Sequence, residues 1–128
     1  MNPESLKYHK EHTWVKASGK KATIGITEHA QEALGDIVFI DLPEVETTVE
    51  ANSELSEIES TKATSSVISP VSGTVIEVNE ELSESPEIIN EEPYGKGWIA
   101  ILEMDDVSEL EDLMDASEYG SYLEEEAK

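Results

Sequence analysis

Two extended segments flank residues 59–64, and this arrangement constrains the fold more than any other feature of the sequence. The segment 54–59 carries Leu55 and Ile58, and the segment 67–78 is rich in the β-branched residues that favour strands. Small or short side chains surround Lys62 and cannot cover it. The pattern therefore predicts a β-hairpin that presents Lys62 at an exposed tip.

The hairpin alone leaves two interpretations of Lys62 open. A lysine at a loop tip is usually only a solvated charge. The tip lacks the Asn-Gly or Asp-Gly pair that most strongly marks a tight hairpin, and Leu55 and Ile58 would face opposite sides of a regular strand. From the residues alone, Lys62 is either an attachment point or an ordinary surface charge.

Further strands are predicted before and after the hairpin. The segment 36–42 contains a short continuous apolar run, which predicts a strand buried on both faces. Alternation and turn residues predict additional strands at 8–14, 22–26 and 98–102. The chain is therefore expected to be mainly β.

Short helices are predicted from capping residues. Thr27 can cap a helix that stops at Gly35. Ser108, with Glu111 three residues later, forms a capping box, and Ser117 can cap a further helix. These signals predict a helical segment after the last strand.

The composition excludes several classes of function. The chain has 30 acidic residues against 8 basic ones, a net charge of -22, and no basic patch that could bind nucleic acid or an anionic membrane. No apolar run approaches the roughly 18 residues of a membrane span, and the N-terminus lacks a signal pattern. We therefore expect a soluble protein of the cytoplasm, or of the mitochondrial matrix if it is a processed eukaryotic form.

Metal sites are not predicted. The chain has no cysteine, so thiolate sites and disulfides are excluded. His9 and His12 lie three residues apart, which on an extended strand places them on opposite faces. Each is expected to be a surface histidine.

A family resemblance favours the attachment point. The residues Glu59, Ser60, Thr61, Lys62 and Ala63 are followed after six residues by Pro-Val-Ser-Gly at 70–73. This segment resembles the lipoyl-attachment segment of the glycine cleavage system H protein. Ordered matches extend through most of the chain, at Tyr8, His12 and Trp14 and at 24–31, 34–39, 42–44, 78–79 and 90–98.

The resemblance implies a lipoyl/biotinyl-type barrel-sandwich, in which two antiparallel sheets form a flattened barrel with peripheral short helices. Residues 1–128 would form a single lipoyl-carrier domain. Its core would span about 22–103, and its C-terminal helices about 108–124.

The resemblance also implies a function. Lys62 would carry lipoate as an amide, attached by a lipoate ligase or a lipoyl or octanoyl transferase that recognises Glu59, Ser60, Thr61 and Ala63. The chain would be a monomeric carrier and not an enzyme. It would move an aminomethyl group from glycine decarboxylase (P protein) to the aminomethyltransferase (T protein), and dihydrolipoamide dehydrogenase (L protein) would reoxidise the arm. A surface cleft would shelter the loaded arm.

The sequence departs from the family pattern at several positions. Thr13 stands where a glutamate is common, within a His-Glu-Trp motif, and that carboxylate would lie near the docked arm. Glu46 and Ser56 stand where glycines are usual, and Asn52 lies in a turn that usually contains a glycine. If these positions require a positive φ, Glu46 is strained and Asn52 is tolerated.

Two alternatives stay open. The first is an H-like carrier that relays lipoyl groups to other proteins or serves sulfur metabolism, which Thr13 keeps in consideration. The second is a β scaffold in which Lys62 is never modified and the acidic surface binds a partner.

Overall fold

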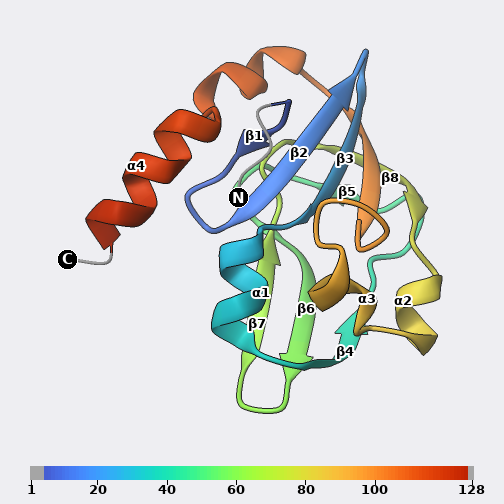
Figure 1. Cartoon of the computed structure of the whole chain (residues 1–128). Coiled ribbons are helices and arrows are strands. Elements are labelled where there is room, and N and C mark those ends of the chain that lie inside the picture. Colours follow the sequence, from blue (N-terminus) through green and yellow to red (C-terminus); the bar gives the residue numbers. More distant parts are fainter. Residues whose placement is uncertain (1–4, 127–128) are drawn as a thin grey trace.

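The computed structural model describes residues 5–126 as two antiparallel sheets with short helices around them (Figure 1). The six-stranded sheet has the strand order β1-β2-β3-β9-β8-β5, and the three-stranded sheet has the order β4-β6-β7. The strands are β1 (Lys7–Tyr8), β2 (Thr13–Ser18), β3 (Lys21–Ile26), β4 (Ile37–Asp41), β5 (Thr48–Val49), β6 (Glu54–Ser60), β7 (Thr64–Ile68), β8 (Gly73–Val78) and β9 (Ala100–Met104).

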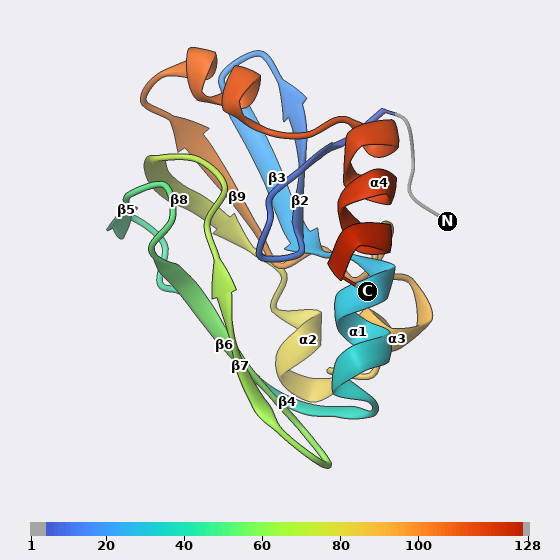
Figure 2. The ribbon, with the colours of Figure 1, turned by 90° about the vertical axis from the view of Figure 1, so that its left-hand side faces the viewer.

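The helices lie at the edges of the sheets, as Figure 2 shows. They are α1 (Glu28–Leu34), α2 (Glu81–Glu84), α3 (Ile88–Glu91), the 3₁₀ helix η1 (Val107–Asp112) and α4 (Ala116–Glu126). Within residues 5–126, no helix has both the length and the apolar character needed to cross a bilayer.

The main core lies between the two sheets. Ile24 and Leu102 from the large sheet and Ile58 and Val67 from the small sheet belong to one buried cluster. Burying these side chains removes apolar surface from water, which is the main force that holds the sheets together. The predicted mainly β fold of two antiparallel sheets is confirmed, but the sheets form a sandwich and do not close into a barrel.

A second, aromatic cluster attaches α4 to the large sheet. The rings of Tyr8 and Tyr119 stack with centroids 4.7 Å apart, and both are fully buried. Trp14 lies in the same cluster and donates from its indole N–H to the Pro93 carbonyl at 2.9 Å. The C-terminal helix is therefore an integral part of the packed structure.

Three predicted strands are wrong in detail. Residues 8–14 do not form one strand, because the chain turns between β1 and β2, where the His12 N–H donates to the His9 carbonyl at 2.9 Å. The segment 67–78 divides between β7 and β8, which lie in different sheets. The last strand begins at Ala100, two residues later than predicted.

The strand β4 is not buried on both faces, which contradicts the prediction from its apolar run. Val38 is 53% and Phe39 50% exposed, because β4 is an edge strand with a register irregularity between Ile37 and Phe39. A similar irregularity in β6, between Glu54 and Ser56, allows both Leu55 and Ile58 to be buried.

The helix predictions are confirmed at α1 and wrong at the caps of the C-terminal segment. The Thr27 hydroxyl accepts from the Ala30 N–H, and Gly35 ends α1. Asp106, and not Ser108, caps a 3₁₀ helix at 107–112. Asp115, and not Ser117, precedes α4 and exchanges two hydrogen bonds with Glu118, which is a capping box.

Candidate functional site

Lys62 lies at the tip of the β6–β7 hairpin, which projects from the body of the molecule at the bottom of Figures 1 and 2. Its side chain and those of Thr61 and Ala63 are exposed. Among residues 5–126, the Lys62 ammonium makes no hydrogen bond and no ion pair. The amine is therefore open to a modifying enzyme.

The Ser60 side chain fixes the shape of the tip. Its hydroxyl oxygen accepts from the N–H groups of Ala63 at 3.1 Å and Lys62 at 3.3 Å, and the hydroxyl donates to the Ala63 carbonyl at 3.2 Å. The Ser60 N–H also donates to that carbonyl at 2.8 Å. A serine that bonds the backbone two and three residues ahead replaces the missing Asn-Gly turn chemistry.

The tip rests on the loop between α1 and β4. The Thr61 N–H donates to the Asp36 carbonyl at 3.0 Å. The aliphatic part of the Lys62 side chain passes over Gly35. A Cβ placed on Gly35 would lie only 3.5 Å from the Lys62 Cε. Gly35 has φ 82° and ψ -153°, a conformation that is essentially restricted to glycine. The lysine base is thus supported from one side while its amine is free.

Asn90 holds this supporting loop in place. Its amide nitrogen donates to the Gly35 carbonyl and to the Gln31 side chain, each at 2.9 Å. Its amide oxygen accepts from the Ile37 N–H at 2.9 Å. One side chain of α3 therefore ties the end of α1 to the start of β4. In the sequence, Asn90 is marked only by its place in the matched segment 90–98, and no local pattern predicts this role.

Glu59 lies on β6 beside the tip. It is exposed and pairs with Thr64 across the hairpin. The predicted segment Glu59, Ser60, Thr61, Lys62 and Ala63 is therefore one continuous surface feature, in which Ser60 shapes the backbone and the other members present side chains to solvent.

A cavity lies at the other end of the hairpin. It has a volume of about 430 Å³ and is lined by residues that include His9, Asn52 and Pro70. Pro70 is eight residues from Lys62, which corresponds to roughly 26 Å of extended chain at about 3.3 Å per residue. Lys62 does not line this cavity.

Thr13 lies near that end and is buried. Its hydroxyl donates to the Ile68 carbonyl of β7 at 2.9 Å, so it supplies no carboxylate to the surface. The positions where the family usually has glycine do require unusual backbone: Glu46 has φ 79° and Asn52 has φ 70°. Ser56 differs, since it has no positive φ and donates from its hydroxyl to the Asp41 carbonyl.

The prediction of surface histidines is wrong for His9. The His9 ring is only 5% exposed, with Nδ1 accepting from the Glu11 N–H and Nε2 donating to the Asn52 side chain. His12 is half-buried, and its ring lies 4.7 Å between centroids from that of His29.

A lipoyl amide at Lys62 is compatible with this geometry. Acylation removes the lysine charge, and no acidic partner among the described residues would be left unpaired by that change. The exposed tip also leaves room for a long substituent, since the nearest supporting contact is to the carbon stem and not to the amine.

Comparison with known proteins is consistent with these features. A family model described as "Glycine cleavage H-protein" matches residues 6–126. The glycine cleavage system H protein of Vibrio campbellii is 56% identical over 124 residues, which cover 96% of this chain and 98% of that protein. The protein of the same name from Staphylococcus carnosus is 50% identical over 123 residues, with coverage of 96% and 98%.

A solved structure has the same fold. The crystal structure of a glycine cleavage system H protein from Mycobacterium marinum superposes with a TM-score of 0.86 and is 38% identical. The match covers 93% of this chain and 96% of that chain.

Proposed function

The chain belongs to the glycine cleavage H-protein family, and from this premise we propose that Lys62 is the residue on which it carries lipoate. Members of this family are carrier proteins of the glycine cleavage system and not enzymes, and this is the function of the chain. The observation that supports Lys62 is its exposed, unpaired amine on a hairpin tip whose backbone is fixed by Ser60 and Asp36.

The residues around Lys62 have distinct tasks in this proposal. Ser60 and the Thr61 N–H keep the tip in one shape, so a lipoate ligase or lipoyl or octanoyl transferase meets a preformed substrate. Glu59, Thr61 and Ala63 supply the exposed side chains that this enzyme contacts. The bound group supplies a disulfide that accepts the aminomethyl unit. The Lys62 side chain packs over Gly35, and the hydrogen bond from the Asn90 side chain to the Gly35 carbonyl holds that loop in place.

The partners follow from the same assignment. The carrier interacts with the glycine cleavage enzymes, and we propose contacts with glycine decarboxylase, the aminomethyltransferase and dihydrolipoamide dehydrogenase in turn. Because one tip must serve several enzymes, each contact should be transient. We further propose one carrier domain over residues 1–128 that acts as a monomer, and a cytoplasmic location, since the matched relatives are bacterial.

The first test is glycine–bicarbonate exchange. Lipoylated chain is incubated with glycine decarboxylase, glycine and labelled bicarbonate, and label in glycine is measured. The parent chain should support exchange. Lys62→Arg should reduce exchange to the level without carrier, because arginine keeps the charge but cannot form the amide.

Lys16→Arg is the matched control, because Lys16 is also exposed but lies on β2, away from the hairpin tip. It should support exchange at the parental rate. A chain that is lipoylated yet supports no exchange would favour the lipoyl relay and contradict the proposed shuttle. A chain that is never lipoylated would favour the unmodified scaffold.

A further inference from the structure

Three potential metal ligands meet on the side of the molecule where α4 approaches α1. They are His12 from the β1–β2 turn, His29 from α1 and Glu126 from α4, called here the His-His-Glu cluster. One ligand atom from each lies within 4.8 Å of the others. The His12 Nε2 is 3.2 Å from the Glu126 carboxylate, and the two imidazole rings are 4.7 Å apart between centroids.

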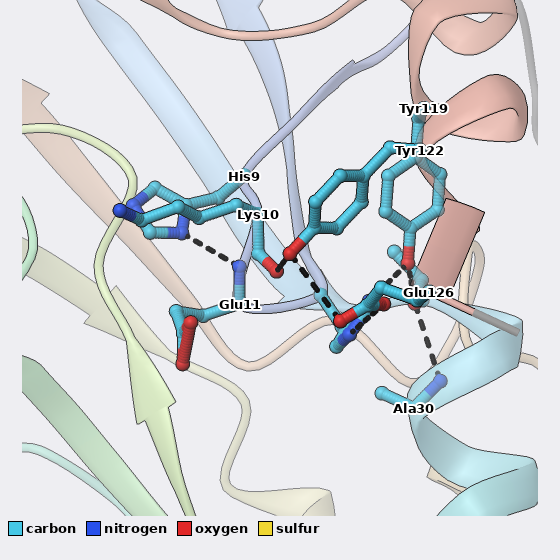
Figure 3. Close-up of polar contacts among 9 residues, drawn as sticks. His9, Lys10, Glu11, Ala30, Tyr119, Tyr122 and Glu126 are labelled. Atoms are coloured by element: carbon cyan, nitrogen blue, oxygen red, sulfur yellow. Dashed lines mark hydrogen bonds and ion pairs between the residues drawn. The ribbon is translucent and has the colours of Figure 1, made fainter. Parts of the chain in front are cut away.

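The position of His12 is set by its backbone and by a buried hydroxyl pair. Its φ is 68°, and its carbonyl accepts from the Thr27 N–H at 3.1 Å. Its Nδ1 lies 2.8 Å from the Tyr119 hydroxyl, which is also 2.8 Å from the Thr27 hydroxyl. Figure 3 shows Tyr119 and Tyr122 of α4 directed toward this turn, with Glu126 beside them.

This hydroxyl pair can fix the tautomer of His12. Burial raises the pKa of Tyr119 to about 12, so at neutral pH it is a hydroxyl that can accept from Nδ1–H and donate to Thr27. A second partner on Nδ1 orients most metal-binding histidines. In the tautomer with the proton on Nδ1, Nε2 is the nitrogen that would bind an ion placed between it and the Glu126 carboxylate.

We propose that the His-His-Glu cluster binds one divalent cation of the zinc class, with water as the fourth ligand. Two imidazole nitrogens and one carboxylate are a donor set that Zn²⁺ takes when three protein ligands leave one position open. The bound ion would join the β1–β2 turn, α1 and α4, which are distant in sequence. The inference is independent of Lys62 and of the proposed function.

Only small movements are needed to bind the ion. Ligand atoms about 2.1 Å from a tetrahedral Zn²⁺ lie about 3.4 Å apart. The His12 and Glu126 atoms already have nearly this separation. His29 and Glu126 are exposed, so their side chains can rotate by the remaining distance without disturbing the core.

The surrounding charge favours a cation. The groups that influence His12 electrostatically are Glu126, Glu11, His29 and His9, and no lysine is among them. The net charge of -22 raises the local concentration of cations over the whole surface. The same charge also causes weak binding to scattered carboxylates, so the test must separate the two.

The test is a calorimetric titration of Zn²⁺ into the full chain, produced without lipoate so that no lipoyl thiol competes. Excess Mg²⁺ is present to saturate carboxylate sites, because hard oxygen ligands suit Mg²⁺ and imidazole suits Zn²⁺. We expect one tight site per chain. His29→Gln and Glu126→Gln should each weaken it at least tenfold, and since both side chains are exposed the fold should be unaffected.

One control and one positioning variant complete the test. Glu125→Gln removes a neighbouring exposed carboxylate on α4 and should bind as the parent does. Tyr119→Phe should weaken binding about 10- to 100-fold through His12. Absence of a one-to-one site, or a site unchanged by His29→Gln, would overturn the proposal.

Discussion

The backbone of Glu46 lies in the left-handed region although its side chain is exposed. Its φ is 79°, and its N–H donates to the Val75 carbonyl at 2.7 Å, which holds the residue in this conformation. A side chain with a Cβ is disfavoured there by roughly 1–2 kcal/mol, whereas glycine adopts it freely. The packed β5–β8 region therefore imposes strain at this position.

We expect Glu46→Gly to raise the free energy of unfolding by up to about 1 kcal/mol, since relief of strain exceeds the entropy that glycine adds to the unfolded chain. Urea denaturation measures this as a higher midpoint with an unchanged slope.

Asn52→Gly is the contrasting variant. Asparagine tolerates φ 70°, and its side chain accepts a hydrogen bond from His9, so its removal should give no gain. Equal stabilisation by both variants, or a loss at Glu46→Gly, would contradict the assignment of strain.

Some backbone conformations of single residues can be predicted from the sequence, and others cannot. The positive φ of Glu46 and Asn52 could be anticipated because the family usually has glycine there. The left-handed conformation of His12 could not, because it depends on the turn between β1 and β2 and on its contact with Thr27. The His-His-Glu cluster could not be predicted either, because the spacing of His9 and His12 along one segment does not reveal that His29 of α1 lies next to His12.

At the level of elements, the end of α1 is the support of the hairpin tip. Gly35 ends the helix and lies under the Lys62 side chain. Its carbonyl accepts a hydrogen bond from the Asn90 side chain. Residues other than glycine cannot adopt its φ of 82° and ψ of -153° without strain.

Gly35→Ala should lower the free energy of unfolding by about 1–3 kcal/mol, because alanine cannot adopt this backbone without strain. Chemical denaturation measures the loss. The tip should also become a poorer substrate for lipoylation, because the loop that contacts Thr61 and the Lys62 stem shifts.

Gly120→Ala is the matched control in α4. A Cβ there meets nothing within 4 Å and the residue is helical, so alanine should stabilise by about 0.5–1 kcal/mol. If Gly35→Ala were also neutral or stabilising, the support described for the tip would not be real.

Elements were predictable where the signal is local. Thr27 and Gly35 mark both ends of α1 in the sequence. The exposure of β4 was not predictable, because an apolar run does not reveal that its strand lies at the edge of a sheet. The register shift in β6 was likewise invisible, since only tertiary packing decides that Leu55 and Ile58 share the core.

For the whole molecule, the two-sheet fold and the exposed hairpin tip were foreseen, mainly from the family resemblance and only partly from periodicity. What was not foreseen is how the parts are joined. Asn90 connects α3 to the loop beneath Lys62, and the Tyr8–Tyr119 stack connects β1 to α4. Such contacts link residues far apart in sequence, and no local pattern encodes them.

We propose that this architecture presents Lys62 for lipoylation. The most direct measurement is the intact mass of the chain after co-expression with a lipoate ligase in a host supplied with lipoate, followed by peptide mapping. We predict a gain of one lipoyl group per chain, located on Lys62 and absent from Lys62→Arg. An unchanged mass, or a lipoyl group on another lysine, would contradict the account.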